Sequence, residues 1–255
     1  MFERIKTHTV CAAAALLFVG TQTVRAQIGQ HRNDLAVGIS GGYVLSSIGF
    51  TPKVTQQQHP GFTAGLSMRY TCEKYFNTIC AISAELNYVR IGWKERILTA
   101  DDQPVINATT GLAEAYQRDI NYIQVPVFAH LAWGREQRGM QFFFKAGPQF
   151  GYMIGESTKT NFSVKEANLK DRANRTCAQD TMGVENKFDY GIAAGLGMEY
   201  SLPGAGHLQL EARYYYGLGN IFGDSKRDYF GKSNHSNIVV KMTYLFDITT
   251  TRRRK

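Results

Sequence analysis

Residues 184–219 contain two neighbouring segments in which apolar residues alternate with small or charged ones. In Phe188–Tyr200 the alternation runs for thirteen residues, whereas a strand of a soluble domain usually has about 4–8. A strand that crosses a lipid bilayer needs about 9–11 residues, with apolar side chains outward and aromatic rings at both water–lipid boundaries. The pattern therefore predicts membrane-spanning β-strands. The apolar face of the first segment consists of Phe188, Tyr190, Ile192, Ala194, Leu196, Met198 and Tyr200.

The same alternation predicts eight strands along the chain. They are 34–44, 60–71, 80–93, 116–133, 140–154, 188–200, 208–217 and 236–248. After the N-terminal segment, no stretch approaches the roughly 20 consecutive apolar residues of a membrane helix. Since only helices and closed barrels satisfy all backbone groups in lipid, we expect an all-β, eight-stranded antiparallel transmembrane barrel. A soluble β-sandwich or lipocalin-like barrel is the alternative. Pro126 lacks an N–H donor and predicts a bulge or gap in its strand.

The predicted connections alternate in length. The connections 45–59, 94–115, 155–183 and 220–235 are long, while 72–79, 134–139 and 201–205 are short. Outer-membrane barrels have short periplasmic turns and long extracellular loops. We therefore expect the cell outer membrane as the location, with both termini in the periplasm.

The N-terminus has the pattern of a secretory signal peptide. Arg4 and Lys6 precede an apolar run at 10–20, and Val24-Arg25-Ala26 is a small-residue cleavage site. We assign 1–26 to the signal peptide and 27–255 to the barrel domain, with the strands within 34–248 and a basic tail at 249–255. Cleavage would remove Glu3 and three basic residues, which lowers the net charge from +8 to +6. We interpret the tail as solvated, and we expect no nucleic-acid partner.

The inward faces predict a filled interior. They carry four basic and four acidic residues, which are Arg69, Lys145, Arg213, Lys241, Glu85, Asp189, Glu199 and Glu211. An eight-stranded barrel is just wide enough for side chains to fill it, and charges there must be paired. Inward glycines make room for these long side chains. They are Gly38, Gly42, Gly65, Gly147, Gly151, Gly191, Gly195 and Gly197.

Aromatic residues fall near the expected membrane boundaries, where amphipathic rings are favoured. For the outer boundary we expect Tyr43, Trp93, Tyr152, Phe188, Tyr214 and Tyr216. For the inner boundary we expect Tyr70, Trp133, Tyr200 and Phe246.

The chemistry-bearing residues predict no catalytic, metal or cofactor site. Cys72 and Cys80 flank a short turn and form either a disulfide or two free thiols. His130 is expected inward, in a structural hydrogen bond. His235 and Ser236 are similar to part of the His-x-Ser-Asn motif of lipid A deacylases, but adjacent strand residues point to opposite faces. We therefore expect no enzyme.

Three stretches indicate a family resemblance. Tyr122-Ile-Gln-Val-Pro-Val-Phe resembles the Tyr-Leu-Glu-Ile-Pro-Leu segment of the Bacteroidota outer-membrane β-barrel domain family, commonly called the PorT family. Phe188–Tyr200 is similar to its Gly-rich strand and Leu210–Leu218 to its Glu-Ala-Arg-Tyr strand, with Gln124 replacing the usual Glu. The resemblance covers most of 34–248. It implies a barrel of the cell envelope, in a family whose namesake is required for type IX protein secretion.

We accordingly predict a non-enzymatic outer-membrane protein. It contacts the lipid bilayer, and other envelope or secretion proteins are expected partners. It is either a type IX secretion-associated component or a surface-binding protein whose long loops recognise a ligand, since binding residues concentrate on loops held by a rigid scaffold. The loop 159–175 is the richest in charge. A small diffusion pore is the alternative, and a lipid-modifying enzyme using His235 is a further one.

Overall fold

The computed structural model describes residues 29–251, apart from 137, 164, 166, 174–176 and 224–228. The predicted signal peptide and residues 252–255 of the predicted tail lie outside the described residues, so both stay predictions. No helix among the described residues has the length and hydropathy of a membrane span.

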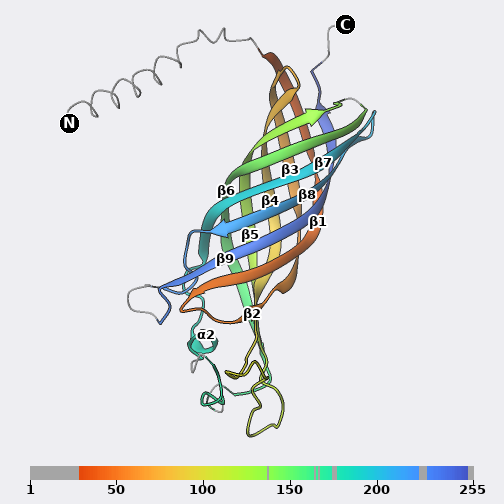
Figure 1. Cartoon of the computed structure of the whole chain (residues 1–255). Coiled ribbons are helices and arrows are strands. Elements are labelled where there is room, and N and C mark those ends of the chain that lie inside the picture. The colour runs from red at the N-terminus through yellow and green to blue at the C-terminus, as the bar shows by residue number, and fades with distance from the viewer. Residues whose placement is uncertain are drawn as a thin grey trace, which may run out of the picture.

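Eight long strands form the body of the molecule (Figure 1). They are β1 (Gln30–Thr51), β3 (His59–Tyr75), β4 (Thr78–Glu95), β5 (Tyr116–Gly134), β6 (Gly139–Thr160), β7 (Phe188–Leu202), β8 (Gly206–Gly217) and β9 (Lys232–Thr249). Each pairs antiparallel with its neighbours in the chain, and β1 pairs with β9, so the sheet closes into a ring. The predicted fold class is confirmed. The short strand β2 (Gln56–Gln57) pairs with β4, and α2 (Ala178–Thr181) is a single helical turn.

The two ends of the barrel differ in their connections. At the end where β1 begins and β9 ends, here called the terminal end, the turns 76–77, 135–138 and 203–205 are short. At the opposite end, the loop end, the connections 52–58, 96–115, 161–187 and 218–231 are longer. The predicted alternation is confirmed. Which end faces the periplasm stays a prediction.

Several strands extend further toward the loop end than the alternation predicts. β1 pairs with β9 as far as Thr51 and Lys232, and β6 pairs with β5 as far as Thr160 and Tyr116. The residues added to β6, Gly155–Thr160, are mostly polar and exposed on both sides. Backbone pairing therefore continues β6 into a stretch where its side chains no longer alternate in burial.

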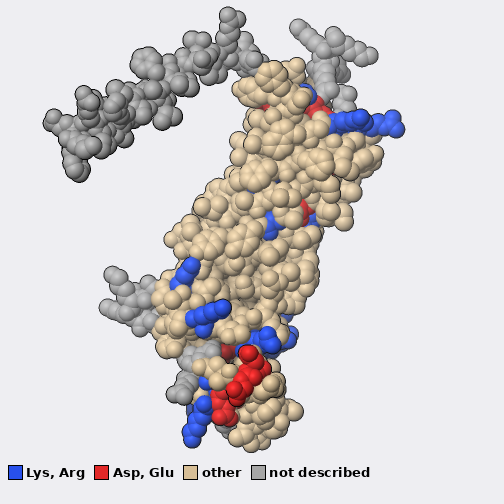
Figure 2. Space-filling view, in the orientation of Figure 1, with Lys and Arg blue, Asp and Glu red and all other residues tan. Residues whose placement is uncertain are grey.

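The outward faces form an exposed apolar band. Exposed residues include Ile39, Leu66, Leu86, Val125, Phe144, Leu196, Leu210 and Val240. Figure 2 shows that the middle of the barrel on this face is mostly uncharged and that charged side chains gather toward its ends. Every aromatic residue predicted at a boundary is exposed or half-buried, with one exception. Trp93 is 0% exposed, so its boundary assignment is wrong; it shares the inward face with Glu85.

The predicted break at Pro126 is confirmed. Between β4 and β5 the pairing runs from Asn87↔Gln124 directly to Ala84↔Val127. Between β5 and β6 it runs from Pro126↔Gln149 to Ala129↔Ala146, opposite Pro148. The missing N–H donors of the two prolines account for this gap in the ladder.

Inward glycines occupy positions where side chains of neighbouring strands come close. A Cβ atom on Gly42 would lie 2.5 Å from the Cβ of Lys241 and 2.4 Å from the carbonyl oxygen of Val240. For the adjacent, outward Gly41, the nearest atom would be the carbonyl oxygen of Thr63 at 4.0 Å. Glycine is thus required for packing at the first position but not at the second.

This contrast gives a matched test of the inward and outward faces. Gly42→Val should lower the free energy of unfolding by about 1–3 kcal/mol because it overpacks the interior. Gly41→Val should be neutral or stabilising, since a β-branched residue suits an exposed strand position. Urea unfolding of protein refolded into lipid vesicles measures both. Equal destabilisation by the two substitutions would contradict the assigned faces.

Candidate functional site

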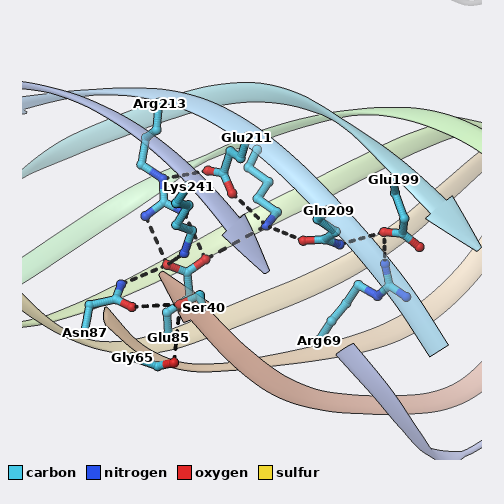
Figure 3. Close-up of polar contacts among 11 residues, drawn as sticks. Ser40, Gly65, Arg69, Glu85, Asn87, Glu199, Gln209, Glu211, Arg213 and Lys241 are labelled. Atoms are coloured by element: carbon cyan, nitrogen blue, oxygen red, sulfur yellow. Dashed lines mark hydrogen bonds and ion pairs between the residues drawn. The ribbon is translucent and has the colours of Figure 1, made fainter. Parts of the chain in front are cut away.

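Glu85 of β4 lies at the centre of an ionic network inside the barrel (Figure 3). Its two oxygens accept hydrogen bonds from Arg213 Nη2 at 2.9 Å and Nη1 at 3.1 Å, a bidentate arrangement. Lys241 Nζ donates to Glu85 Oε2 at 2.6 Å, and Lys145 Nζ lies 3.9 Å from Oε1. One carboxylate therefore connects four strands, β4, β6, β8 and β9, across the lumen.

The network continues along the lumen toward the terminal end. Glu211 accepts hydrogen bonds from Arg213 Nε at 2.7 Å and from Lys145 Nζ at 3.1 Å. Gln209 joins this group to Glu199, whose Oε2 accepts a hydrogen bond from Gln209 Nε2 at 2.6 Å and another from Arg69. All seven predicted inward charges of this network are buried or nearly so. The eighth, Asp189, accepts a hydrogen bond from Tyr215 Oη at 2.7 Å. The predicted filled, salt-bridged interior is confirmed.

An apolar cluster fills the barrel at its loop end. Trp93 of β4 packs edge-on against Phe50 of β1, with ring centroids 5.6 Å apart. Phe222 and Phe230 from the connection 218–231 lie 5.9 Å and 4.8 Å from Phe50. We call this cluster the apolar plug, and its other buried members include Val44, Ile48, Ile91, Ile97, Val105, Tyr116, Ile120, Tyr122 and Ile221. The lumen is thus occupied by ion pairs at one level and by packed rings at another.

The described residues of connections 96–115 and 161–187 fold together beyond the loop end, and we call them the loop cap (Figure 1). Arg172 joins the two connections. Its Nη2 donates to Glu114 Oε2 at 2.8 Å and its Nη1 to Asp180 Oδ2 at 3.2 Å. The backbone N–H of Asn168 donates to Glu114 Oε1 at 2.8 Å. These side chains are buried except for the half-buried Asn168, so the loop cap has a fixed polar core.

Glu95, at the end of β4, anchors the loop cap to the barrel. It accepts a hydrogen bond at 2.8 Å from Gln179 Nε2 of α2. Burial raises the pKa of Glu95 to about 8, and the nearby Asp180 carboxylate contributes to the shift. The pKa of Asp180 is raised by the same burial. Protonation of Glu95 removes the repulsion between these two buried carboxylates, so the anchor is strongest when Glu95 carries the proton.

The outer surface of the loop cap carries three exposed aliphatic side chains. Ile106, Leu112 and Leu169 are 49%, 60% and 39% exposed. The backbone segments that carry them are close together, because Asn168 Nδ2 donates to the carbonyl oxygen of Ile106 at 3.2 Å and the N–H of Asn107 donates to that of Leu112 at 2.9 Å. We call these three side chains the apolar cap patch. It lies outside the apolar band of the barrel.

A cavity of about 400 Å³ opens at the terminal end. Ser201, His207 and Asp247 line it, with Ser201 Oγ 3.0 Å from His207 Nδ1 and His207 Nε2 3.1 Å from Asp247 Oδ1. This resembles a Ser-His-Asp triad, but Glu199 Oε1 lies 2.8 Å from the same Nδ1. A carboxylate this close favours a proton on Nδ1, and a protonated Nδ1 cannot accept one from Ser201. The arrangement is a chain of polar contacts without an activated nucleophile.

The two histidines considered from the sequence are both buried and inward. His235 Nε2 lies 3.2 Å from Tyr122 Oη inside the barrel, whereas Ser236 Oγ is bonded to Tyr214 Oη on the outside. The predicted opposite orientation of His235 and Ser236 is confirmed. His130 stacks on Phe143, with ring centroids 5.0 Å apart, and its Nδ1 has no hydrogen-bond partner among the described residues. The expected structural hydrogen bond is thus not made by Nδ1.

Cys72, Cys80 and Cys177 are free thiols. The register between β3 and β4 shifts between Thr71 and Glu73, so Glu73 rather than Cys72 is paired with Cys80. Of the two alternatives left open by the sequence, the structure has the two free thiols. Within the described residues, no group of three or more His, Cys, Asp or Glu side chains is arranged to hold a metal ion.

The sequence of residues 25–223, which include β1 to β8, matches the profile of the outer membrane protein beta-barrel domain family. The chain belongs to this family. It is therefore an outer-membrane β-barrel protein, and the soluble alternatives are rejected. The match does not single out the PorT group or Bacteroidota, so the finer resemblance stays a prediction. No curated protein sequence is significantly similar to the chain.

Solved barrels with little sequence identity resemble the structure. Neisserial surface protein A is 10% identical with a TM-score of 0.40, and the alignment covers 83% of this chain and 97% of that one. OprG of Pseudomonas aeruginosa is 12% identical with a TM-score of 0.41, covering 86% and 98%. Ail, the attachment invasion locus protein of Yersinia pestis, solved with the heparin analogue sucrose octasulfate, is 15% identical with a TM-score of 0.35, covering 84% and 99%.

The buried network of the loop cap was not predicted from the sequence. Glu114 and Arg172 are 58 positions apart in two connections without periodic patterning. The available signal was weak: a few apolar residues are scattered among polar ones in these connections, and two of them, Val105 and Phe162, become buried.

The interior network predicts a large effect of one substitution. Glu85→Ala should cost about 3–5 kcal/mol of unfolding free energy, because buried Lys241 would lose its carboxylate partner and Arg213 and Lys145 would share Glu211 alone. Glu185→Ala, at an exposed acidic position, should change it by no more than about 0.5 kcal/mol. Urea titration of the refolded protein in vesicles checks both values. Similar stabilities of the two variants would contradict a charge-sealed lumen.

The raised pKa of Glu95 predicts a pH-dependent loop cap. A carboxyl with a raised folded-state pKa contributes stability that is complete below about pH 4.5 and is lost as pH rises toward about 8. Amide hydrogen exchange in 177–187, corrected for intrinsic rates, should show falling protection between pH 5 and pH 9. Glu95→Gln should flatten this dependence. An unchanged pH profile in the variant would assign the effect to another group.

Proposed function

We propose that this protein is a non-conducting outer-membrane scaffold whose loop cap binds a protein partner at the cell surface. The carrying observation is the apolar cap patch, formed by exposed aliphatic side chains on a segment with its own buried polar core. Exposed apolar clusters outside lipid mark interaction sites. A loop that is already ordered also loses little conformational entropy when it binds.

The occupied lumen supports a binding role over a diffusion pore. Ion pairs around Glu85 and the rings around Trp93 lie at successive levels of the same interior. A water-filled channel would require the ion pairs of Glu85 to separate, and a buried charge without its partner has a high free-energy cost. The absence of an activated nucleophile at Ser201 likewise favours binding over catalysis.

The proposal includes an orientation. Long connections are extracellular in outer-membrane barrels, which would place the loop cap outside the cell and both termini in the periplasm. The similarity of 122–128 and Phe188–Tyr200 to PorT-family segments supports an envelope or secretion protein as the partner.

The apolar cap patch can be tested with a triple substitution, Ile106→Ser, Leu112→Ser and Leu169→Ser. Binding of the partner should weaken at least about tenfold, because roughly 25 cal/mol per Å² of buried apolar surface would be lost. Protein in lipid nanodiscs is incubated with envelope and extracellular fractions, and retained proteins are quantified by mass spectrometry.

The matched control is Asp101→Ser, Gln103→Ser and Lys170→Ser, three exposed polar positions on the same connections. It should retain the partner as wild type does. If all three forms retain the same proteins, the apolar cap patch is not the binding surface. Steady ion conductance of the wild-type protein in planar bilayers would contradict the sealed scaffold.

A further inference from the structure

A cluster of basic side chains lies on the outer face of β4, β5 and β6 at the loop end. We call Arg90, Lys94 and Lys159 the basic patch. Lys94 and Lys159 are both paired through Gln117, so Lys94, Gln117 and Lys159 form one row across the three strands. Directly paired residues point to the same face of a sheet. Lys94 is exposed, and the side chains of Arg90 and Lys159 are 36% and 66% exposed.

One acidic side chain, Asp119, lies within the basic patch, and both of its carboxylate oxygens have polar partners. Its Oδ1 is 2.6 Å from His59 Nε2 and 2.9 Å from Gln117 Nε2. Its Oδ2 accepts a hydrogen bond from Arg90 and lies 3.9 Å from Lys159 Nζ. One carboxylate against three cations leaves an excess positive charge on this face. The neighbouring Glu156 faces Arg118 at 4.0 Å.

The basic patch directly adjoins the apolar band. Tyr88 and Tyr152, which are both exposed, are each paired with Ile123. The next outward pair on these strands, two residues closer to the loop end, is Arg90 with Asn121. Farther along the outer side of β4, Ala84 and Leu86 line an open apolar hollow of about 520 Å³. One strand thus offers cations at the lipid boundary and an apolar depression below them.

We propose that the basic patch binds the phosphate headgroup of an anionic membrane lipid in the leaflet at the loop end. Lys and Arg side chains near a membrane surface each contribute to such binding, and the attraction falls with salt. The position at the edge of the apolar band favours a lipid over a soluble phosphate, because the acyl chains then remain on the apolar surface. The site is independent of the function proposed for the loop cap.

The test uses phosphatidylglycerol as the probe and Lys94→Gln with Lys159→Gln as the variant. Arg90 is kept, since it also neutralises Asp119. Native mass spectrometry of protein released from micelles with equal phosphatidylglycerol and phosphatidylcholine measures which lipid is retained. The wild type should prefer phosphatidylglycerol, and its binding constant should fall about fivefold for each charge removed.

Lys165→Gln with Lys170→Gln is the control, because it removes the same charge from exposed positions of the loop cap. It should bind phosphatidylglycerol as wild type does. Equal retention by the variant and the wild type would overturn the proposal. Displacement of phosphatidylglycerol by an equal concentration of glycerol phosphate would also overturn it, in favour of a soluble phosphate site. Heat-modified gel mobility verifies that each variant is folded.

Discussion

The carboxylate of Glu85 is the interaction on which the rest of the structure depends. Closing eight strands into a ring leaves a lumen that only side chains can fill. A charge placed there must find its partners among the other strands. Arg213, Lys241 and Lys145 meet this requirement from three different strands. A shift of any of these strands by one residue would turn its ionic side chain to the outer face, so the network fixes the register of the ring as well as filling it.

Because the interior is filled, the surfaces available for function are the two ends of the barrel and its outer face. At the loop end, the apolar plug separates the ionic interior from the loop cap, whose own core is built on Arg172. At the terminal end, the Glu199 carboxylate lies 2.8 Å from Nδ1 of His207, the ring nitrogen that would have to accept the proton of a serine nucleophile. The same kind of buried ion pair thus stabilises both regions, while the exposed side chains around them differ in character.

The sequence predicted those parts of the structure on which lipid and lumen impose a period of two. The eight strands and the eight inward charges follow from that alternation. The gap in the ladder at Pro126 could be predicted because a proline has no N–H to donate. Trp93 was misassigned because its aromatic type suggested a membrane boundary, although its spacing from Glu85 places it inward. The bulge at Cys72 and the contact between Glu114 and Arg172 depend on tertiary packing, which no local pattern encodes.

The unequal strand lengths described above give the barrel a stepped rim. β7 begins opposite Tyr152, whereas β5 and β6 continue pairing to Thr160, about eight residues or roughly 26 Å farther along β6. The loop cap therefore lies on the extended ends of β5 and β6, on one side of the barrel. The neighbouring strands β7 and β8 end earlier, at Phe188 and Gly217, and β9 extends beyond β8 where it pairs with β1 as far as Lys232. A large ligand bound beside the loop cap would lie over β7 and β8, so the difference in strand length sets its distance from the membrane surface.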